Sequence, residues 1–427
     1  REELRTGKSM LASIKDGYQH SFSAIIDANV TTILTALVLV YFGLGPIKGF
    51  GVVLTIGVLS SLFTAILVSR LAIDWWTDKG RSIGFWNKWS ENVLSNININ
   101  WMGYRKYGYM FSGIMILLSI GSFFVRGFDL GVDFKGGYSY NVQFETSTDA
   151  QAIRESLTKT FGAAPVVKAV DTENTFNITT SYLVDSQDEN AAKQVTEKLH
   201  EGINSLVGGN LNLETFSDPS GTGTHITSSS KVGAIIADDI KDSSFQSTFF
   251  ALLLIFVYLF IRFNRWEFSV GAVAALFHDV IITVGMFSLF YGILPFSMEI
   301  DQAFVAAILT VIGYSVNDTV IVFDRIREFI STYSGKTKEE IFNMAINTTL
   351  SRTLITSGTT LVVIISLLMF GGGSIKGFAF ALFIGILFGT YSSVFVASSI
   401  VVDLVKEIKP KEVKKKKAEG SFSRTKA

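Results

Sequence analysis

Charged side chains inside apolar stretches are the residues of this sequence from which chemistry is first expected. Five ionisable side chains lie at such positions: Asp27, His278, Asp279, Asp318 and Arg352. A charge at the centre of a membrane-spanning helix costs about 2.5–3.5 kcal/mol, so retained charges are expected to face a protein interior or a wet crevice. We therefore predict that they lie inside a helix bundle.

A carboxylate beside an arginine can exchange a proton, because Arg keeps its charge while the carboxylate titrates. Arg352 can pair with Asp27 or Asp318, and we predict that these three residues form a proton relay. His278 and Asp279 are candidates for a secondary relay. Static ion pairs that lock helices together, and a histidine with a packing role, remain the alternatives.

The composition of the 427-residue chain is that of a membrane protein. Hydrophobic residues make up 48% and charged residues 17%, against about 25% charged residues in soluble domains, and the mean hydropathy is +0.39. The 37 basic and 37 acidic residues cancel, so no net field attracts nucleic acid. Without Cys and with four scattered His, disulfides, iron–sulfur clusters and thiolate zinc sites are excluded. We expect no cofactor and no metal cluster, although a two-carboxylate site stays open.

Several apolar stretches are long enough to span a bilayer core, which takes about 20 residues of helix. They are residues 25–42, 47–72, 109–125, 245–261, 268–291, 303–323, 348–370 and 375–404. Basic residues gather on one side of the alternating path, in 1–15, 79–106, 262–265, 325–338 and 406–417. Because basic flanks stay cytoplasmic, the insert 128–229 is predicted to lie outside the cytoplasm.

The fold class predicted is a polytopic α-helical membrane protein of about eight spans with an α+β extracytoplasmic domain. The regions are two spans (1–74), an interfacial cytoplasmic linker (75–107), a third span (108–127), the insert (128–229), five spans (230–405) and a basic, disordered cytoplasmic tail (406–427). The linker contains Trp75, Trp76, Trp86, Trp89 and Trp101. This aromatic density favours a helix at the membrane surface, and a plain polar linker is the alternative.

The insert alternates strand and helix patterns. Strands are predicted at 138–145, 166–170, 175–181 and 211–216, and helices at 149–161 and 189–206. This order of elements is typical of a ferredoxin-like domain. Gly136 and Gly137 begin the insert and are hinge candidates because glycine gives the backbone freedom; a simple turn would need them equally.

Two parts of the chain repeat one another. Residues 41–71 and 369–399 align without gaps and share an IKGF turn between paired spans, which predicts parallel repeats about an axis along the membrane normal. In this alignment Ala24 stands opposite Arg352, and Asp27 opposite Ile355. One half thus carries an Asp and the other an Arg at nearby positions of equivalent helices, which favours a site at their shared interface.

Short motifs in a specific order resemble the SecD/SecF family. GVDFKGG (131–137), VNDT (316–319) and FDRIRE (323–328) are similar to SecF signatures, and IDANVTT (26–32) with GPIKGF (45–50) is similar to the last two SecD spans. The chain resembles the C-terminal part of a fused SecDF protein over nearly its whole length. In that family Asp318 and Arg352 match functional residues of SecF, and Asp27 matches a SecD carboxylate. The N-terminal SecD-like half, with a further intramembrane Asp, is not in this chain.

The resemblance implies an accessory of the Sec translocon, built like resistance-nodulation-division transporters. Proton flow would drive outer domains that pull or retain exported unfolded polypeptide. The expected partners are the Sec translocon (SecYEG), a membrane insertase, membrane lipids and the SecD-like half. The expected location is the bacterial inner membrane, with the insert on the periplasmic side. The coupling ion is expected to be H⁺, and Na⁺ stays open because carboxylates serve both.

Other functions stay open. The chain could be a passive translocon scaffold, or a small-molecule or lipid efflux transporter of the same superfamily, although the insert shows no large apolar pocket. An enzyme is not expected, because no nucleophile–base pair, phosphate loop or metal-ligand spacing occurs in the sequence.

Overall fold

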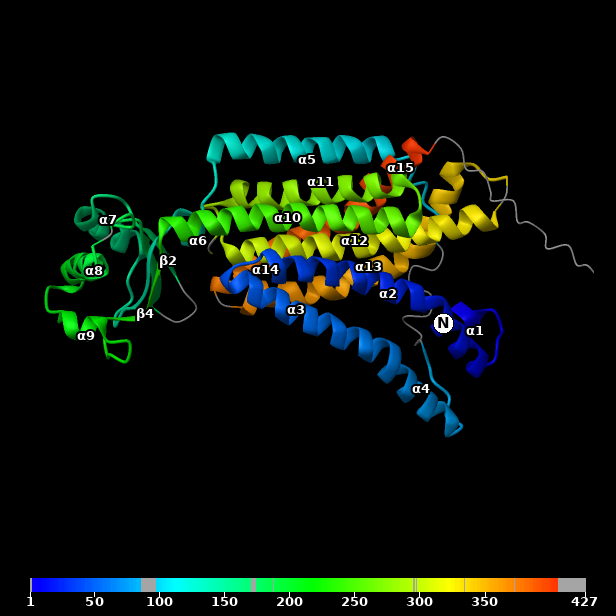
Figure 1. Cartoon of the computed structure of the whole chain (residues 1–427), viewed down its shortest axis with the longest axis horizontal. Helices are drawn as coiled ribbons and strands as arrows, with labels where there is room; N and C mark the ends of the chain where they lie inside the picture. Colours follow the sequence, from blue (N-terminus) through cyan, green and yellow to red (C-terminus); the bar gives the residue numbers. More distant parts are fainter. Residues whose placement is uncertain are drawn as a thin grey trace, which may run out of the picture.

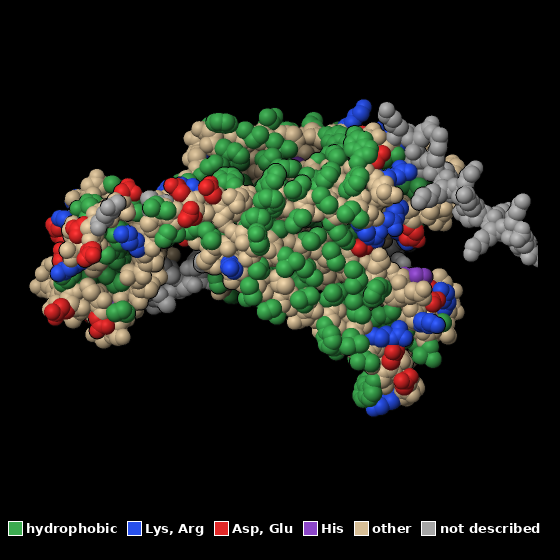
Figure 2. Space-filling view, in the orientation of Figure 1, with side chains coloured by type: hydrophobic (Ala, Val, Ile, Leu, Met, Phe, Trp, Pro, Cys, Tyr) green, Lys and Arg blue, Asp and Glu red, His purple; other side chains and the backbone are tan. Residues whose placement is uncertain are grey.

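The protein is a long helical bundle with a small α+β domain at one end (Figure 1). This computed structural model describes residues 2–85, 97–169, 174–186, 188–294, 296, 298–333, 335–371 and 373–405. Eight of the described helices are long and apolar enough to cross a membrane, as predicted. Their side chains present an apolar surface, and charged residues gather at the two ends of the molecule (Figure 2).

The spans are longer than the apolar stretches that predict them. After the short α1 (Glu2–Arg5), the helices of the bundle are α2 (Met10–Phe42), α3 (Gly45–Phe63), α4 (Ser69–Asp78), α5 (Arg105–Arg126), α10 (Ala234–Phe263), α11 (Trp266–Phe290), α12 (Gln302–Thr332), α13 (Lys338–Phe370), α14 (Gly373–Ser392) and α15 (Ser398–Leu404). Capping explains one early start: the Thr337 hydroxyl accepts from the Glu340 N–H and forms a capping box. Polar first turns therefore extend the helices beyond the apolar windows.

The internal repeat is visible in the helix geometry. A π-helical turn joins α3 to α4 at Thr64–Val68, and another joins α14 to α15 at Ser393–Ala397. The alignment of 41–71 with 369–399 places these turns one residue apart. Since π-helical turns are rare and occur frequently at functional sites, their shared position supports a duplicated helix pair.

Helix α12 is the centre of the bundle. In its most apolar stretch 83% of the residues are buried, against 6% for the α3–α4 span. It packs closely on α14, where a Cβ added to Gly385 would meet Val311 at 2.1 Å. A displacement of α12 would therefore disturb several neighbouring helices at once, because protein interiors are close-packed.

The outer domain contains a four-stranded antiparallel sheet in the order β2-β3-β1-β4, which confirms the ferredoxin-like prediction. Its elements are α6 (Val132–Lys135), β1 (Gly137–Gln143), α7 (Ala150–Phe161), β2 (Val166–Ala169), β3 (Thr175–Thr180), α8 (Ala191–Val207), α9 (Leu213–Ser217) and β4 (His225–Val232). The Asp149 side chain caps α7 by accepting from the Gln151 N–H.

The prediction of a last strand at 211–216 is wrong. The Asn212 side chain accepts from the Glu214 N–H and begins the short helix α9, and Phe216 fills the domain core. The last strand is β4, whose Ser228, Ser229 and Ser230 are exposed. Its pairing with β1 defines it, and it lacks the apolar alternation by which strands are found in a sequence.

Part of the linker and the tail lie outside the described residues. Trp75 and Trp76 continue the second span within α4, and Trp101 donates to the Asn347 side chain at 2.9 Å. Trp86, Trp89 and the tail 406–427 are not described, so the surface helix and the disordered tail stay predictions.

Candidate functional site

Asp318 lies in the middle of the bundle on α12 and is 1% exposed. The Ser357 hydroxyl of α13 donates to its Oδ2 at 3.1 Å, and the Thr390 hydroxyl of α14 donates to Ser357 at 2.7 Å. Its Oδ1 has no hydrogen-bond partner among the described residues. A buried carboxylate with one weak donor and one bare oxygen is an acceptor for a proton.

Asp279 on α11 forms a second buried site and is fully inaccessible to solvent. Ser315 of α12 and Ser392 of α14 donate to its Oδ2 at 2.7 and 2.8 Å. The His278 Nδ1 lies 2.9 Å from its Oδ1. His278 therefore belongs to the carboxylate site, and a secondary relay through the pair stays a prediction.

The two sites are parts of one polar layer across α11, α12, α13 and α14. Ser315 and Asp318 are one turn apart on α12, so a single helix carries a contact to each carboxylate. Thr390 and Ser392 are two residues apart on α14 and serve the Asp318 and Asp279 sites respectively. The last turn of α14 thus lines both sites.

Asp27 belongs to a separate site on α2. The Arg262 guanidinium of α10 donates to its Oδ2 from Nη2 at 2.6 Å and from Nε at 2.8 Å, and the Tyr258 hydroxyl donates to its Oδ1 at 2.8 Å. Arg262 also contacts Asp324 at 3.1 Å. Two guanidinium donors at one oxygen and a hydroxyl at the other stabilise the ionised carboxylate.

The predicted pairing of Arg352 with Asp27 or Asp318 is wrong for this conformation. Asp27 is paired with Arg262 instead, and no ion pair within 4.0 Å joins Arg352 to a carboxylate in the part of the chain that is described. Arg352 is exposed on α13 and still acts electrostatically on Asp318. The structure brings Asp318 and Arg352 near one another but places Asp27 elsewhere.

Sequence reasoning missed the polar partners. The sequence predicts that Arg262 belongs to a basic segment between two spans (262–265), whereas it lies within α10 and neutralises Asp27. The hydroxyl partners were missed too: Ser315, Ser357, Thr390 and Ser392. The adjacent Ser392 and Ser393 lie within an otherwise apolar stretch, and this is the pattern from which a polar site could have been predicted. Serine is common in membrane helices, so this signal alone names no partner.

The glycines that begin the outer domain have a structural explanation. Gly136 and Gly137 have φ of 72° and 147°, which other residues rarely adopt. A Cβ on Gly137 would also meet the Thr180 carbonyl oxygen at 2.7 Å. Gly137 pairs with Val232 in the sheet, and its role as a hinge stays a prediction.

Two family models match the chain. One, described as the C-terminal part of the protein export membrane protein SecD/SecF, matches residues 213–407, and the SecD/SecF GG motif matches residues 121–148. The protein translocase subunit SecF of Rhodothermus marinus is 46% identical over 312 residues, which cover 73% of this chain and 95% of that protein. The chain belongs to the SecD/SecF family.

Larger relatives contain the rest of the chain as well. The protein translocase subunit SecDF of Thermus thermophilus is 33% identical over 417 residues, which cover 97% of this chain and 52% of that protein. The crystal structure of SecDF from Thermus thermophilus, titled as a translocon-associated membrane protein, matches with a TM-score of 0.78 at 32% identity, over 94% of this chain and 51% of that chain. The chain thus spans about half the length of the SecDF relatives, and the predicted resemblance and fold are confirmed.

Proposed function

We propose that this chain is the membrane-embedded part of a proton-driven machine that assists translocation of polypeptides through the Sec translocon. The relatives are protein translocase subunits, which supports a role in translocation and an association with the translocon. The inner membrane is the proposed location, with the outer domain on the periplasmic side. The eight spans and the basic residues at the end opposite the outer domain support this orientation.

The observation that carries the proton step is the hydrogen bonding of Asp318. A carboxylate whose Oδ1 has no partner in the described chain can bind a proton there. Protonation would remove the charge that acts on Arg352 and weaken the acceptor that holds Ser357 of α13. The packing of α12 against α13 would then change, because the two helices share this contact.

The energy available matches a movement of this kind. Each proton that crosses the membrane releases about 2.3 kcal/mol per 100 mV of potential. Breaking one hydrogen bond to a charged group costs about 1.5–3 kcal/mol. One or two protons per cycle would thus be enough to exchange the hydrogen bonds of the Asp318 site.

The proposal is tested by proton flux into vesicles that contain the complete gene product, with and without unfolded polypeptide. We expect a flux that polypeptide stimulates, and its loss in Asp318→Asn, because the amide cannot carry the proton. Asp185→Asn, on the exposed surface of the outer domain, is the matched control and should retain the flux.

The competing functions give other results. A passive scaffold would show no flux in wild type while Asp318→Asn still co-purifies with the translocon. A flux driven by a sodium gradient and insensitive to pH would make Na⁺ the coupling ion. Export of a lipid or dye that requires Asp318 would favour efflux.

A further inference from the structure

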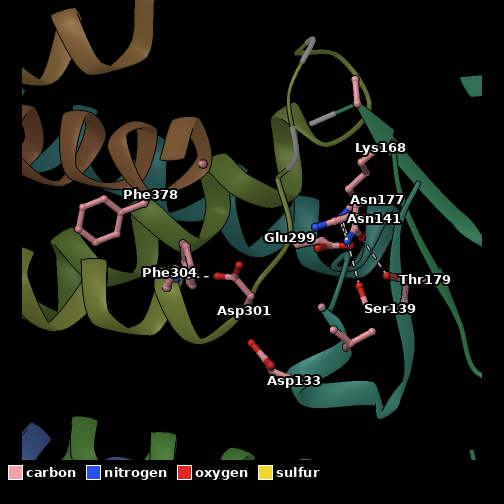
Figure 3. A pocket seen from close by; sticks show the side chains of 15 residues that line it. Asp133, Ser139, Asn141, Lys168, Asn177, Thr179, Glu299, Asp301, Phe304 and Phe378 are labelled. Carbon is pink, nitrogen blue, oxygen red and sulfur yellow. Dashed lines mark hydrogen bonds and ion pairs between the residues drawn. The ribbon is translucent and has the colours of Figure 1, made fainter. Parts of the chain in front are cut away.

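A polar cavity of about 230 Å³ separates the sheet of the outer domain from the outer ends of α12 and α14. Asn141, Lys168 and Asn177 line it from the sheet, and Glu299 and Asp301 line it from the segment that precedes α12 (Figure 3). A contact across this cavity joins the two parts of the molecule that the proposed function requires to move together.

Lys168 makes that contact. It extends from β2 toward the bundle and forms an ion pair with Glu299 (Figure 3). Its side chain is 16% exposed, and a second ion pair joins it to Asp129 at 3.7 Å. Asp129 is 6% exposed in its side chain and is also 3.8 Å from Lys135. Burial excludes much of the water that screens surface ion pairs, so this contact is stronger than an exposed pair but costs desolvation.

The carboxylates that hold Lys168 belong to two segments joined by backbone hydrogen bonds. The Ile300 N–H donates to the Asp129 carbonyl at 2.8 Å, and the Gly131 N–H donates to the Ile300 carbonyl at 2.9 Å. Two residues further on, the Gln302 N–H donates to the Asp133 side chain at 3.1 Å. The chain that enters the outer domain is thus fixed to the first residue of α12.

Helix α12 continues from this attachment to the polar layer in the membrane. It carries Ser315, which contacts Asp279, and Asp318 itself. A helix transmits an axial displacement along its length because each turn is hydrogen-bonded to the next. A shift of α12 at Asp318 would therefore move the loop that holds Glu299.

We propose that Lys168, Asp129 and Glu299 form a latch that docks the outer domain on the outer end of α12 and passes the displacement of α12 to that domain. Lys168 is a positioning residue in this scheme, because it touches no membrane carboxylate. The inference rests on the proposed function, since it names the contact through which the Asp318 site acts on the outer domain.

The first test measures coupling in vesicles that contain the complete gene product. Lys168→Met keeps the length of the side chain and removes its charge. We expect it to retain basal proton flux within about threefold and to lose stimulation by unfolded polypeptide about tenfold. Lys168→Arg keeps the charge and should restore the stimulation. Lys159→Met on the exposed face of α7 is the matched control and should leave both quantities unchanged.

The second test measures docking without reference to flux. The chain has no Cys, so nitroxides can be placed at Glu197→Cys on α8 and Ile293→Cys in the turn after α11, both of which are exposed in the structure. We expect the distance distribution between these labels to broaden in Lys168→Met and to stay narrow in Lys168→Arg and Lys159→Met.

The outcomes separate the latch from the proposed function. Stimulation and label distances that stay unchanged in Lys168→Met would overturn the latch. A loss of basal flux in Lys168→Met with unchanged label distances would place Lys168 in the proton path and would also overturn it. If wild type shows no flux, the proton-driven function fails, and the label distances alone decide whether Lys168 docks the domain.

Discussion

Asp27 and Asp318 are both buried carboxylates on long helices of the bundle, yet their surroundings differ. Asp27 receives two guanidinium donors at one oxygen and a tyrosine hydroxyl at the other. Asp318 receives one serine hydroxyl and keeps one oxygen without a partner in the described chain. The charge of Asp27 is therefore compensated by contact with Arg262, and that of Asp318 only at longer range by Arg352.

This difference predicts different roles for Asp27 and Asp318. A compensated pair stays ionised and holds α2 against α10, which is the static alternative that the sequence left open for Asp27. An uncompensated buried carboxylate is costly to keep ionised, so it is suited to gain and lose a proton. We accordingly expect Asp318 to be the titrating group and Asp27 to be a structural one, contrary to a relay that includes both.

The largest expected effect on stability is that of Arg262→Gln. It leaves Asp27, and Asp324 beside it, without their shared cation, and breaking a buried pair from one side costs about 3–5 kcal/mol. Unfolding of the purified complete protein in detergent measures this loss. The flux per folded molecule should change less than about threefold, because the ion pairs and hydrogen bonds of Arg262 with the described residues reach neither Asp318 nor Asp279.

The double variant Asp27→Asn/Arg262→Gln is the control for that prediction. It removes both charges of the pair, so it should lose less stability than Arg262→Gln alone. Equal losses would mean that Arg262 acts through Asp324 instead. If Asp27→Asn abolishes the flux, Asp27 belongs to the proton relay, and the expected difference between a titrating Asp318 and a structural Asp27 is wrong.

Features formed by residues close together in the sequence are predicted, and contacts between residues far apart in the sequence are missed. The spans, the repeat and the family rest on local apolar runs and short motifs, and these are confirmed. The partner of Asp27 is 235 residues away, and no local pattern connects the two. The serine donors to Asp279 and Asp318 come from three different helices, so only the packing of those helices brings them together.

Asp279→Asn should have the next largest effect on stability. Asp279 accepts from two serine hydroxyls at one oxygen and faces His278 with the other. An amide of the same size can keep only part of this set, and an unsatisfied buried group costs about 1–3 kcal/mol. Unfolding in detergent checks this loss, with Asp185→Asn as the exposed control. A variant as stable as wild type would indicate that Asp279 is already protonated in the folded protein.

Ser357→Ala sharpens the contrast at Asp318. It removes the hydrogen bond to Oδ2, and a hydrogen bond to a charged group contributes about 1.5–3 kcal/mol. Because this bond favours the ionised carboxylate, its loss should slow proton release and reduce flux at neutral pH about tenfold. Thr359→Ala on the exposed side of α13 is the matched control. Unchanged flux in Ser357→Ala would show that water replaces the serine.

The smallest expected effect is on the titration of Lys168. Its charge is compensated in a third way, which differs from those of Asp27 and Asp318. Burial lowers the pKa of Lys168 to about 8, and the charges of Asp129 and Asp301 oppose that shift without cancelling it. The lysine ¹⁵Nζ chemical shift of Lys168, followed by NMR over a range of pH, should therefore titrate with a midpoint near pH 8. For a free lysine the midpoint is about 10.4.

Removing a carboxylate that favours the ammonium must lower the midpoint further, so Asp129→Asn should shift it below that of wild type. A midpoint near that of a free lysine would mean that the outer domain is undocked in solution. Arg262 is paired with two carboxylates, Asp27 and Asp324, whereas Lys168 lies in a site that only partly compensates its charge. Lys168 therefore resembles Asp318 more than Asp27, because its charge can change near neutral pH while that of Arg262 cannot.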